Sequence, residues 1–254
     1  MAVIMKCSFI GVGSAFDAER TNTSILVEGG GSRILLDCGF NAAHGCMRMI
    51  PDPSTIDAVW ISHFHGDHFF GLPFLLGSFF TAGRTKVFHV CGPQGVEDKV
   101  SQAIDLAYPS MRAKLGFNVV FHEFRPGDAE TVAGFSLHTC SIEHSGSALA
   151  LRLESDERAV FYSGDGQLTD DCQILACKAD LGILESYGLA ENVKGHSSVV
   201  GCIDFALSAG LAKVALVHLE PFVRTCRSVQ VLELLDQVDD YEIFLPEEGQ
   251  TVEL

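Results

Sequence analysis

One short apolar segment contains, within six consecutive positions, four side chains of the types that bind metals. The segment Ile61–Pro73 reads ISHFHGDHFFGLP and contains His63, His65, Asp67 and His68. Residues two apart in an extended segment point to the same side, so His63 and His65 can bind one ion. Gly66 can turn the chain, which lets Asp67 and His68 face a second point nearby. Because imidazole and carboxylate are good ligands for zinc-like metals, the segment predicts a metal site between a strand and a helix.

The order of apolar runs along the chain predicts two packed sheets. Short runs rich in β-branched and apolar residues come first, and the last third alternates strand-like and helix-like runs. This order favours an α/β sandwich with helices outside. A helix is predicted from about Asp67 to Ala82. The chain has 254 residues, of which 47% are hydrophobic and 20% charged. We therefore expect one domain over residues 1–254, and the composition excludes a disordered protein.

The balance of charged residues restricts the partners of this chain. The sequence has 17 Lys and Arg against 33 Asp and Glu, a formal net charge of −16, and no basic run is visible. An acidic surface repels polyanions at long range. The charge therefore counts against broad nucleic-acid binding.

Cysteine usage and hydropathy predict a cytoplasmic protein. The nine cysteines are odd in number, include no C-x-x-C motif and often lie in apolar runs, which indicates free thiols in a reducing compartment. The most apolar run, FFGLPFLLGSFF, has 12 residues and is too short to span a bilayer. The N-terminus lacks a signal-peptide pattern. No membrane partner is expected.

Three further polar residues follow strand-like segments elsewhere in the chain. His144 ends LHTCSIEH, Asp165 follows VFYSG, and His218 lies at the end of VALVH. Each of them alone would more commonly be a polar residue with ordinary hydrogen bonds than a ligand. Their shared position, at the end of a strand and before a turn, lets them converge at one edge of the sandwich.

The motif SHFHGDH, together with these three residues, resembles the metallo-β-lactamase superfamily over roughly residues 6–220. The resemblance implies a four-layer αβ/βα sandwich with two divalent ions, of which zinc is expected and manganese or iron are the alternatives. It also implies that Asp37, in ILLDCG, supports the ligand loop. The resemblance implies these ligands: His63, His65 and His144 for one metal, Asp67, His68 and His218 for the other, and Asp165 as a bridge.

Within the superfamily the chain is most similar to ribonuclease Z. The segments FIGVGSAFD and GHSSVVGCIDFALSAGLAKVALVHLEP resemble the opening and the C-terminal signature of that family. The resemblance implies that His196 donates a proton, that Glu185 supports it, and that Asp67 is also catalytic. A homodimer is expected. From the residues alone, His196 could instead simply precede a helix cap formed by Ser197 or Ser198.

The expected function is that of a binuclear metal-dependent phosphodiesterase acting on RNA 3′ ends or on a small nucleotide-like diester. Ribonuclease Z carries a long arm that clamps tRNA, whereas only SDE or so joins the strands SALALRLE and RAVFYSG here. A small or single-stranded substrate is therefore expected. The alternatives are a lactone or thioester hydrolase on the same fold and, third, a metal-binding scaffold without activity.

Overall fold

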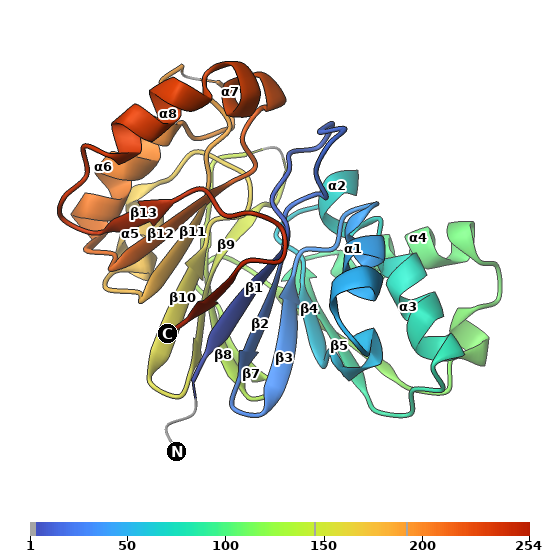
Figure 1. The fold of residues 1–254 in the computed structure, drawn as a ribbon. Coiled ribbons are helices and arrows are strands. Elements are labelled where there is room, and N and C mark those ends of the chain that lie inside the picture. The colour runs from blue at the N-terminus through green and yellow to red at the C-terminus, as the bar shows by residue number, and fades with distance from the viewer. Residues whose placement is uncertain (1–3, 145, 192) are drawn as a thin grey trace.

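Two β-sheets face each other at the centre of the structure, a computed structural model that describes residues 4–144, 146–191 and 193–254. Within these residues each sheet has seven strands (Figure 1). The first sheet contains, in spatial order, β14 (Thr251–Glu253), β1 (Lys6–Gly11), β2 (Ser24–Gly29), β3 (Ser32–Leu36), β4 (Ala58–Trp60), β5 (Phe88–Pro93) and β6 (Val119–Phe124). The second contains β13 (Glu242–Phe244), β12 (Lys213–Val217), β11 (Leu181–Glu185), β10 (Arg158–Tyr162), β9 (Leu149–Ser155), β8 (Phe135–Ser141) and β7 (Ala129–Val132).

Helices cover the outer face of each sheet (Figure 1). The first sheet carries α1 (Ala42–Met49), α2 (Gly66–Phe69), α3 (Leu72–Thr81) and α4 (Val96–Ala107), with the short 3-10 helices η1 (Pro53–Thr55) and η2 (Arg112–Lys114). The second carries α5 (Asp170–Ala176), α6 (Val199–Ala209), α7 (Pro221–Cys226) and α8 (Ser228–Leu235). None of the helices described here is both long enough and apolar enough to cross a membrane.

Three groups of buried apolar residues hold the layers together. One lies between the two sheets and includes Trp60 and Tyr162. The second fills the space between the first sheet and helices α1, α3 and α4, and the third lies under α5, α6 and α8. Strands buried on both faces need near-continuous apolar sequence, which explains runs such as VALV in β12. The arrangement confirms the predicted αβ/βα sandwich.

The predicted helix from Asp67 to Ala82 is wrong in one respect, because the structure divides it into α2 and α3. Gly71 lies between them, and a Cβ atom there would stand 2.1 Å from the carbonyl oxygen of Gly39. Pro73 lies in the first turn of α3, where its missing N–H costs nothing. The break thus follows from Pro73, which starts a new helix, together with the close approach of Gly71 to a distant part of the chain.

Parallel pairing brings the polar strand ends to one edge of the sandwich. β3, β4, β5 and β6 are parallel to one another, as are β10, β11, β12 and β13. The carboxyl ends of parallel strands share an edge, and sites form there. Two residues beyond strand ends, Asp37 (φ 58°) and His218 (φ 61°), have left-handed backbone. Such strain in a non-glycine residue is typical of functional sites.

Candidate metal centre

All seven predicted ligands lie at this edge, and they form two groups. They follow four strands, since the histidine-rich segment comes after β4, His144 after β8, Asp165 after β10 and His218 after β12. His63, His65 and His144 form one group, and Asp67, His68, Asp165 and His218 form the other. In each group, one ligand atom from every residue lies within 4.8 Å of the others.

The first group contains three imidazoles that face one another. Nε2 of His144 lies 3.3 Å from Nδ1 of His65. The ring of His63 lies 4.6 Å from that of His65 and 4.7 Å from that of His144, measured between centroids. Nδ1 of His144 lies 2.6 Å from the carbonyl oxygen of Gly195. This carbonyl accepts the Nδ1 proton and so leaves Nε2 as the ligand atom.

The second group is almost completely buried and combines two imidazoles with two carboxylates. Nε2 of His68 lies 3.1 Å from Asp67 and 3.3 Å from Asp165. Nδ1 of His218 lies 3.2 Å from the other oxygen of Asp165. The rings of His68 and His218 are stacked, with centroids 5.3 Å apart. Asp165 thus contacts both histidines of its group through different oxygens.

The residues present fit divalent metal ions. Nε2 of His63 is buried and makes no hydrogen bond with any described residue, and the equally buried Nε2 of His68 has only the carboxylates of Asp67 and Asp165 beside it. A buried polar nitrogen without a partner costs about 1–3 kcal/mol. Coordination removes that cost, and an imidazole and carboxylate donor set suits zinc-like ions.

A single carboxylate, that of Asp37, supports the ligand loop from behind. It accepts hydrogen bonds from the backbone N–H of Ser62 at 2.7 Å, from the Ser62 hydroxyl at 2.7 Å and from the Tyr162 hydroxyl at 2.6 Å. Nδ1 of His68 lies 2.7 Å from its Oδ2 atom. Such a contact keeps the proton on Nδ1 and turns Nε2 toward the metal position. The supporting position expected for Asp37 is therefore where the structure places this residue.

The electrostatics favour ligand protonation states at His63 and Asp165. At His68, burial acts to lower the pKa, but Asp165 and Asp37 outweigh it and hold that pKa well above its usual range, so an ion would replace a proton there. Burial and the nearby His68 hold the pKa of His63 well below its usual range, so this imidazole is neutral. Burial acts to raise the pKa of Asp165, but His218 and His68 outweigh it and hold that pKa well below its usual range. Neutral imidazole and ionised carboxylate are the forms that bind metals.

A histidine and glutamate pair lies next to the first group. Nδ1 of His196 lies 2.8 Å from Oε1 of Glu185, and the backbone N–H of Ser197 donates to Oε2 at 2.8 Å. Burial raises the pKa of Glu185 to about 7, and the hydrogen bond with Glu185 raises the pKa of His196. The ring of His196 lies 5.1 Å from that of His144. Ser198 is the N-cap of α6, so the cap and this pair coexist.

Two aromatic contacts of the site did not follow from the sequence. The hydroxyl of Tyr162 donates a hydrogen bond to Asp37 from the opposite sheet. The ring of Tyr187 stacks on that of His196, with centroids 4.7 Å apart. In the sequence, each tyrosine is marked only by its position. Tyr162 ends an apolar strand just before Asp165, and Tyr187 follows Glu185 just beyond another.

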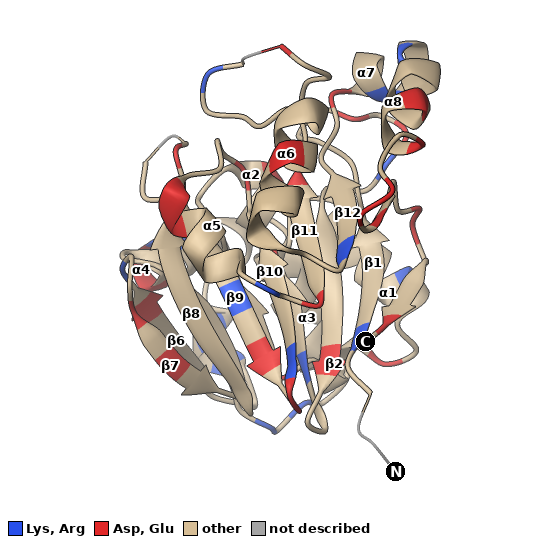
Figure 2. Cartoon of the chain, turned by 90° about the vertical axis from the view of Figure 1, so that its left-hand side faces the viewer, with Lys and Arg blue, Asp and Glu red and all other residues tan. Residues whose placement is uncertain are grey.

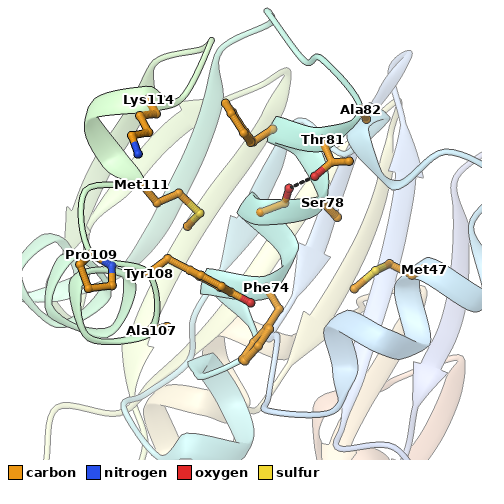
Figure 3. Close-up of a pocket in the computed structure, with 12 residues that line it drawn as sticks. Met47, Phe74, Ser78, Thr81, Ala82, Ala107, Tyr108, Pro109, Met111 and Lys114 are labelled. Atoms are coloured by element: carbon orange, nitrogen blue, oxygen red, sulfur yellow. Dashed lines mark hydrogen bonds between the residues drawn. The ribbon is translucent and has the colours of Figure 1, made fainter.

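A groove of about 910 Å³ lies outside the centre and contains none of the seven predicted ligands. It runs along α3 and is closed on one side by the segment from the end of α4 to η2 (Figure 3). Its lining is mainly apolar, with Met47, Phe74, Tyr108 and Met111. Phe74 and Tyr108 meet edge to face, with ring centroids 5.8 Å apart.

Comparison with known proteins assigns the family. The sequence profile described as "Anti-Pycsar protein Apyc1" matches residues 5–185. The chain belongs to this family. It is also 30% identical over 156 residues to ribonuclease Z of Myxococcus xanthus (strain DK1622), a match that covers 61% of the chain and 49% of that enzyme. The chain thus spans about half the length of the curated relatives that it matches first.

Solved structures show the same fold over nearly the whole chain. The metallo-beta-lactamase fold protein YhfI from Bacillus subtilis superposes with a TM-score of 0.81 and 23% identity, covering 98% of this chain and 99% of that one. The short form of human tRNase Z gives a TM-score of 0.79 and 22% identity, covering 97% and 98%. These likenesses confirm the metallo-β-lactamase fold, and the curated matches confirm the predicted ribonuclease Z-like branch. A divalent metal site with candidate His and Asp ligands follows.

Proposed function

We propose that this chain is a binuclear metal-dependent hydrolase that cleaves phosphodiesters, with residues 1–254 acting as one domain. The observation that carries the proposal is the pair of ligand groups with the His196 and Glu185 pair beside them. The curated relatives named ribonuclease Z support a phosphodiesterase. Two bound divalent ions supply Lewis acidity and a nucleophile derived from water near neutral pH. Zinc is the ion that the donor set suits best.

The proposed ligands are divided between two metal sites, which correspond to the two groups of residues described above. Asp165 would be shared between the two sites, because its carboxylate contacts His68 and His218 of the second group and its charge acts on His63 of the first. One site is held by His63, His65 and His144, and the other by Asp67, His68 and His218.

His196 is the residue of this chain that acts as the general acid. Glu185 holds Nδ1, which leaves Nε2 free to give its proton to the leaving oxygen of the substrate. An alkoxide leaving group has a very high pKa, so a positioned acid accelerates its departure by about 10²–10⁴-fold. The raised pKa of His196 keeps the proton available near neutral pH. Tyr187 stacks on the ring and restricts its rotation.

The substrate that we propose is a small or single-stranded phosphodiester, including an RNA 3′ end. Only Asp156 and Glu157 separate β9 from β10, and both have positive φ, as in a tight hairpin turn. Lys and Arg residues are scattered singly among Asp and Glu over the face in Figure 2. The net charge of −16 disfavours a long nucleic acid, whose phosphate backbone is held mainly by Lys and Arg contacts.

The remaining proposals concern assembly and location. The exposed side chains along the groove of Figure 3, among them Met47, Phe74, Phe80 and Tyr108, form an apolar face that supports a homodimer. Sedimentation equilibrium tests the dimer.

All nine cysteines are free, and seven are buried, which supports a reducing, cytoplasmic location, although Cys177 and Cys226 are exposed.

A direct assay tests the function. Protein purified without chelator is assayed with bis(p-nitrophenyl) phosphate, a thioester and a lactone, and its metal content is measured in parallel. We expect more than one metal equivalent per chain and hydrolysis of the diester above that of the other two. Preference for the thioester or the lactone by the metal-loaded protein would overturn the proposal.

A further inference from the structure

Two cysteine side chains touch each other between the second sheet and helix α5, away from the metal centre. Cys140 lies near the end of β8, and Cys172 lies in α5. Their Sγ atoms are 3.6 Å apart, and both residues are buried. The two sulfurs of a disulfide are about 2.05 Å apart. A small shift of α5 against β8 therefore brings this pair within bonding distance.

The contact makes one of the two thiols easier to ionise than a lone buried thiol. Cys140 donates its S–H to the sulfur of Cys172. This hydrogen bond outweighs burial and lowers the pKa of Cys172 to about 7, while the same bond, together with burial, raises the pKa of Cys140. Burial alone raises the pKa of Cys7 to about 12. The pair thus supplies one thiolate near neutral pH, and the thiolate is the form of cysteine that attacks an oxidant.

The segments that carry these two cysteines also carry two of the proposed metal ligands. His144 follows the first cysteine by four residues, and Asp165 precedes the second by seven. Between the cysteines and the ligands, the two segments pair with each other. The backbone N–H of Gln167 donates to the carbonyl of Glu143 at 2.9 Å, and that of Glu143 donates to the carbonyl of Gln167 at 3.3 Å. A movement at the cysteines is therefore transmitted toward both ligands.

The carbonyl of Ser141 joins the two segments beside the cysteines. It accepts a hydrogen bond from the Thr169 hydroxyl at 3.3 Å and lies 3.5 Å from Sγ of Cys172. A disulfide takes the sulfur of Cys172 away from this carbonyl and draws α5 toward β8. The displaced segment continues to His144, three residues beyond Ser141, whose contact with a backbone carbonyl keeps Nε2 as the ligand atom.

We propose that Cys140 and Cys172 form a reversible disulfide that weakens metal binding by the group of His63, His65 and His144. This inference rests on the proposed metal-dependent function and adds a means of regulating it. Because Cys140 is only 8% exposed and Cys172 is fully buried, the oxidant is a small peroxide and not a bulky disulfide.

The reaction balances with a peroxide as the only co-reactant. The thiolate of Cys172 attacks one oxygen of hydrogen peroxide, so that an S–O bond forms, the O–O bond breaks and hydroxide leaves. The thiol of Cys140 then attacks the oxidised sulfur, an S–S bond forms, and the hydroxyl group leaves with the thiol proton as water. Two electrons pass from the sulfurs to the peroxide. Exchange with a dithiol reverses the step and restores both thiols.

Peptide mass spectrometry tests the disulfide itself. Reduced protein is treated with hydrogen peroxide, its remaining thiols are alkylated, and its tryptic peptides are compared with and without reduction. We expect the peptide of Cys140 to be joined to that of Cys172, and Cys172→Ser to abolish the joined species. Cys177 is exposed and shares the tryptic peptide of Cys172. Cys177→Ser is therefore the matched control and keeps the link.

Zinc affinity, measured on the same samples by competition with a chromophoric chelator, tests the consequence. We expect peroxide to lower the affinity by about 10- to 100-fold, the usual effect of disturbing the support of a ligand. Dithiothreitol, removed before the measurement, restores the affinity. After peroxide, Cys140→Ser retains the affinity of its reduced form, whereas Cys177→Ser loses affinity as the wild type does.

Three outcomes overturn the inference. Free thiols at both positions after peroxide mean that the sulfurs are in contact only as part of the core. A joined peptide with unchanged zinc affinity means that the disulfide does not act on the metal centre. Reduced wild-type protein that binds no zinc removes the proposed function and this inference with it, whereas zinc binding that peroxide leaves unchanged removes the inference alone.

Discussion

Oδ2 of Asp37 lies 2.7 Å from Nδ1 of His68, and both side chains are fully buried. The same carboxylate also holds Ser62 and, across the sandwich, Tyr162. One residue at the end of β3 thus fixes the ligand loop after β4 and couples it to the second sheet. The orientation of His68 in the second ligand group therefore depends on a side chain that belongs to neither group.

Asp37→Asn tests this coupling. The amide retains the volume but cannot act as a charged acceptor for Nδ1 of His68, and loss of such a partner typically weakens metal binding by 10–100-fold. We expect zinc affinity, measured by competition with a chromophoric chelator, to fall by about that factor. The control is Glu130→Gln, which removes a carboxylate bound to His122 away from the centre. Equal affinities for Asp37→Asn and this control would contradict the prediction.

His65→Ala removes a ligand of the first group. We expect the variant to lose metal and diesterase activity together, because three imidazoles hold this site and the two remaining rings bind an ion weakly. Metal content by elemental analysis and activity are measured on the same sample. His89→Ala, a histidine outside both groups, should retain both properties. Full activity in His65→Ala would show that the ligand assignment is wrong.

His196→Ala separates acid catalysis from metal binding. The variant should keep its metals, because His196 belongs to neither ligand group. Its rate on a diester with an alkoxide leaving group should fall by about 10²–10⁴-fold. The loss should be much smaller with p-nitrophenolate, which leaves without a proton, and His138→Ala serves as the control. Equal losses on both leaving groups would identify His196 as structural or substrate-binding.

Glu185→Gln should change the pH dependence of the reaction. The hydrogen bond with Glu185 raises the pKa of His196, so the acid stays protonated to higher pH. Removing the carboxylate lowers that pKa, and the fall in kcat/KM on the alkaline side should move to lower pH. The measurement is a pH profile of kcat/KM with an alkoxide ester, compared with that of Glu130→Gln. An alkaline limb that moves to higher pH would show that Glu185 does not hold the proton on His196.

The two groups of candidate ligands were predictable because their members sit in a dense motif and at the ends of apolar strands. Strand ends are visible in the sequence as a polar residue after β-branched residues, and parallel pairing brings them to one edge. The sequence could not show that Asp165 joins His68 and His218, or that Tyr162 reaches Asp37. Those contacts depend on how far apart the two sheets pack, which no local pattern encodes.

Helix boundaries were less predictable for the same reason. The helix α1 was not predicted, because its eight residues include a glycine and a histidine and its stability comes from packing against the first sheet. The interruption between α2 and α3 depends on the close approach of Gly71 to Gly39. In both places a tertiary contact decides the local structure.

The choice between tRNA and small diesters can be tested by salt dependence. A tight turn joins β9 to β10, and the net charge is −16, so few cations are available for a phosphate backbone. Affinity that depends on Lys and Arg contacts falls steeply with salt, by about 10³–10⁵ between 50 and 200 mM for 6–10 contacts. We expect kcat/KM for a short diester to equal or exceed that for a precursor tRNA, and to change little with salt. The two substrates are compared at low and at physiological ionic strength. A preference for the tRNA that persists at physiological salt would contradict the prediction and would require a tRNA-binding surface from a second subunit.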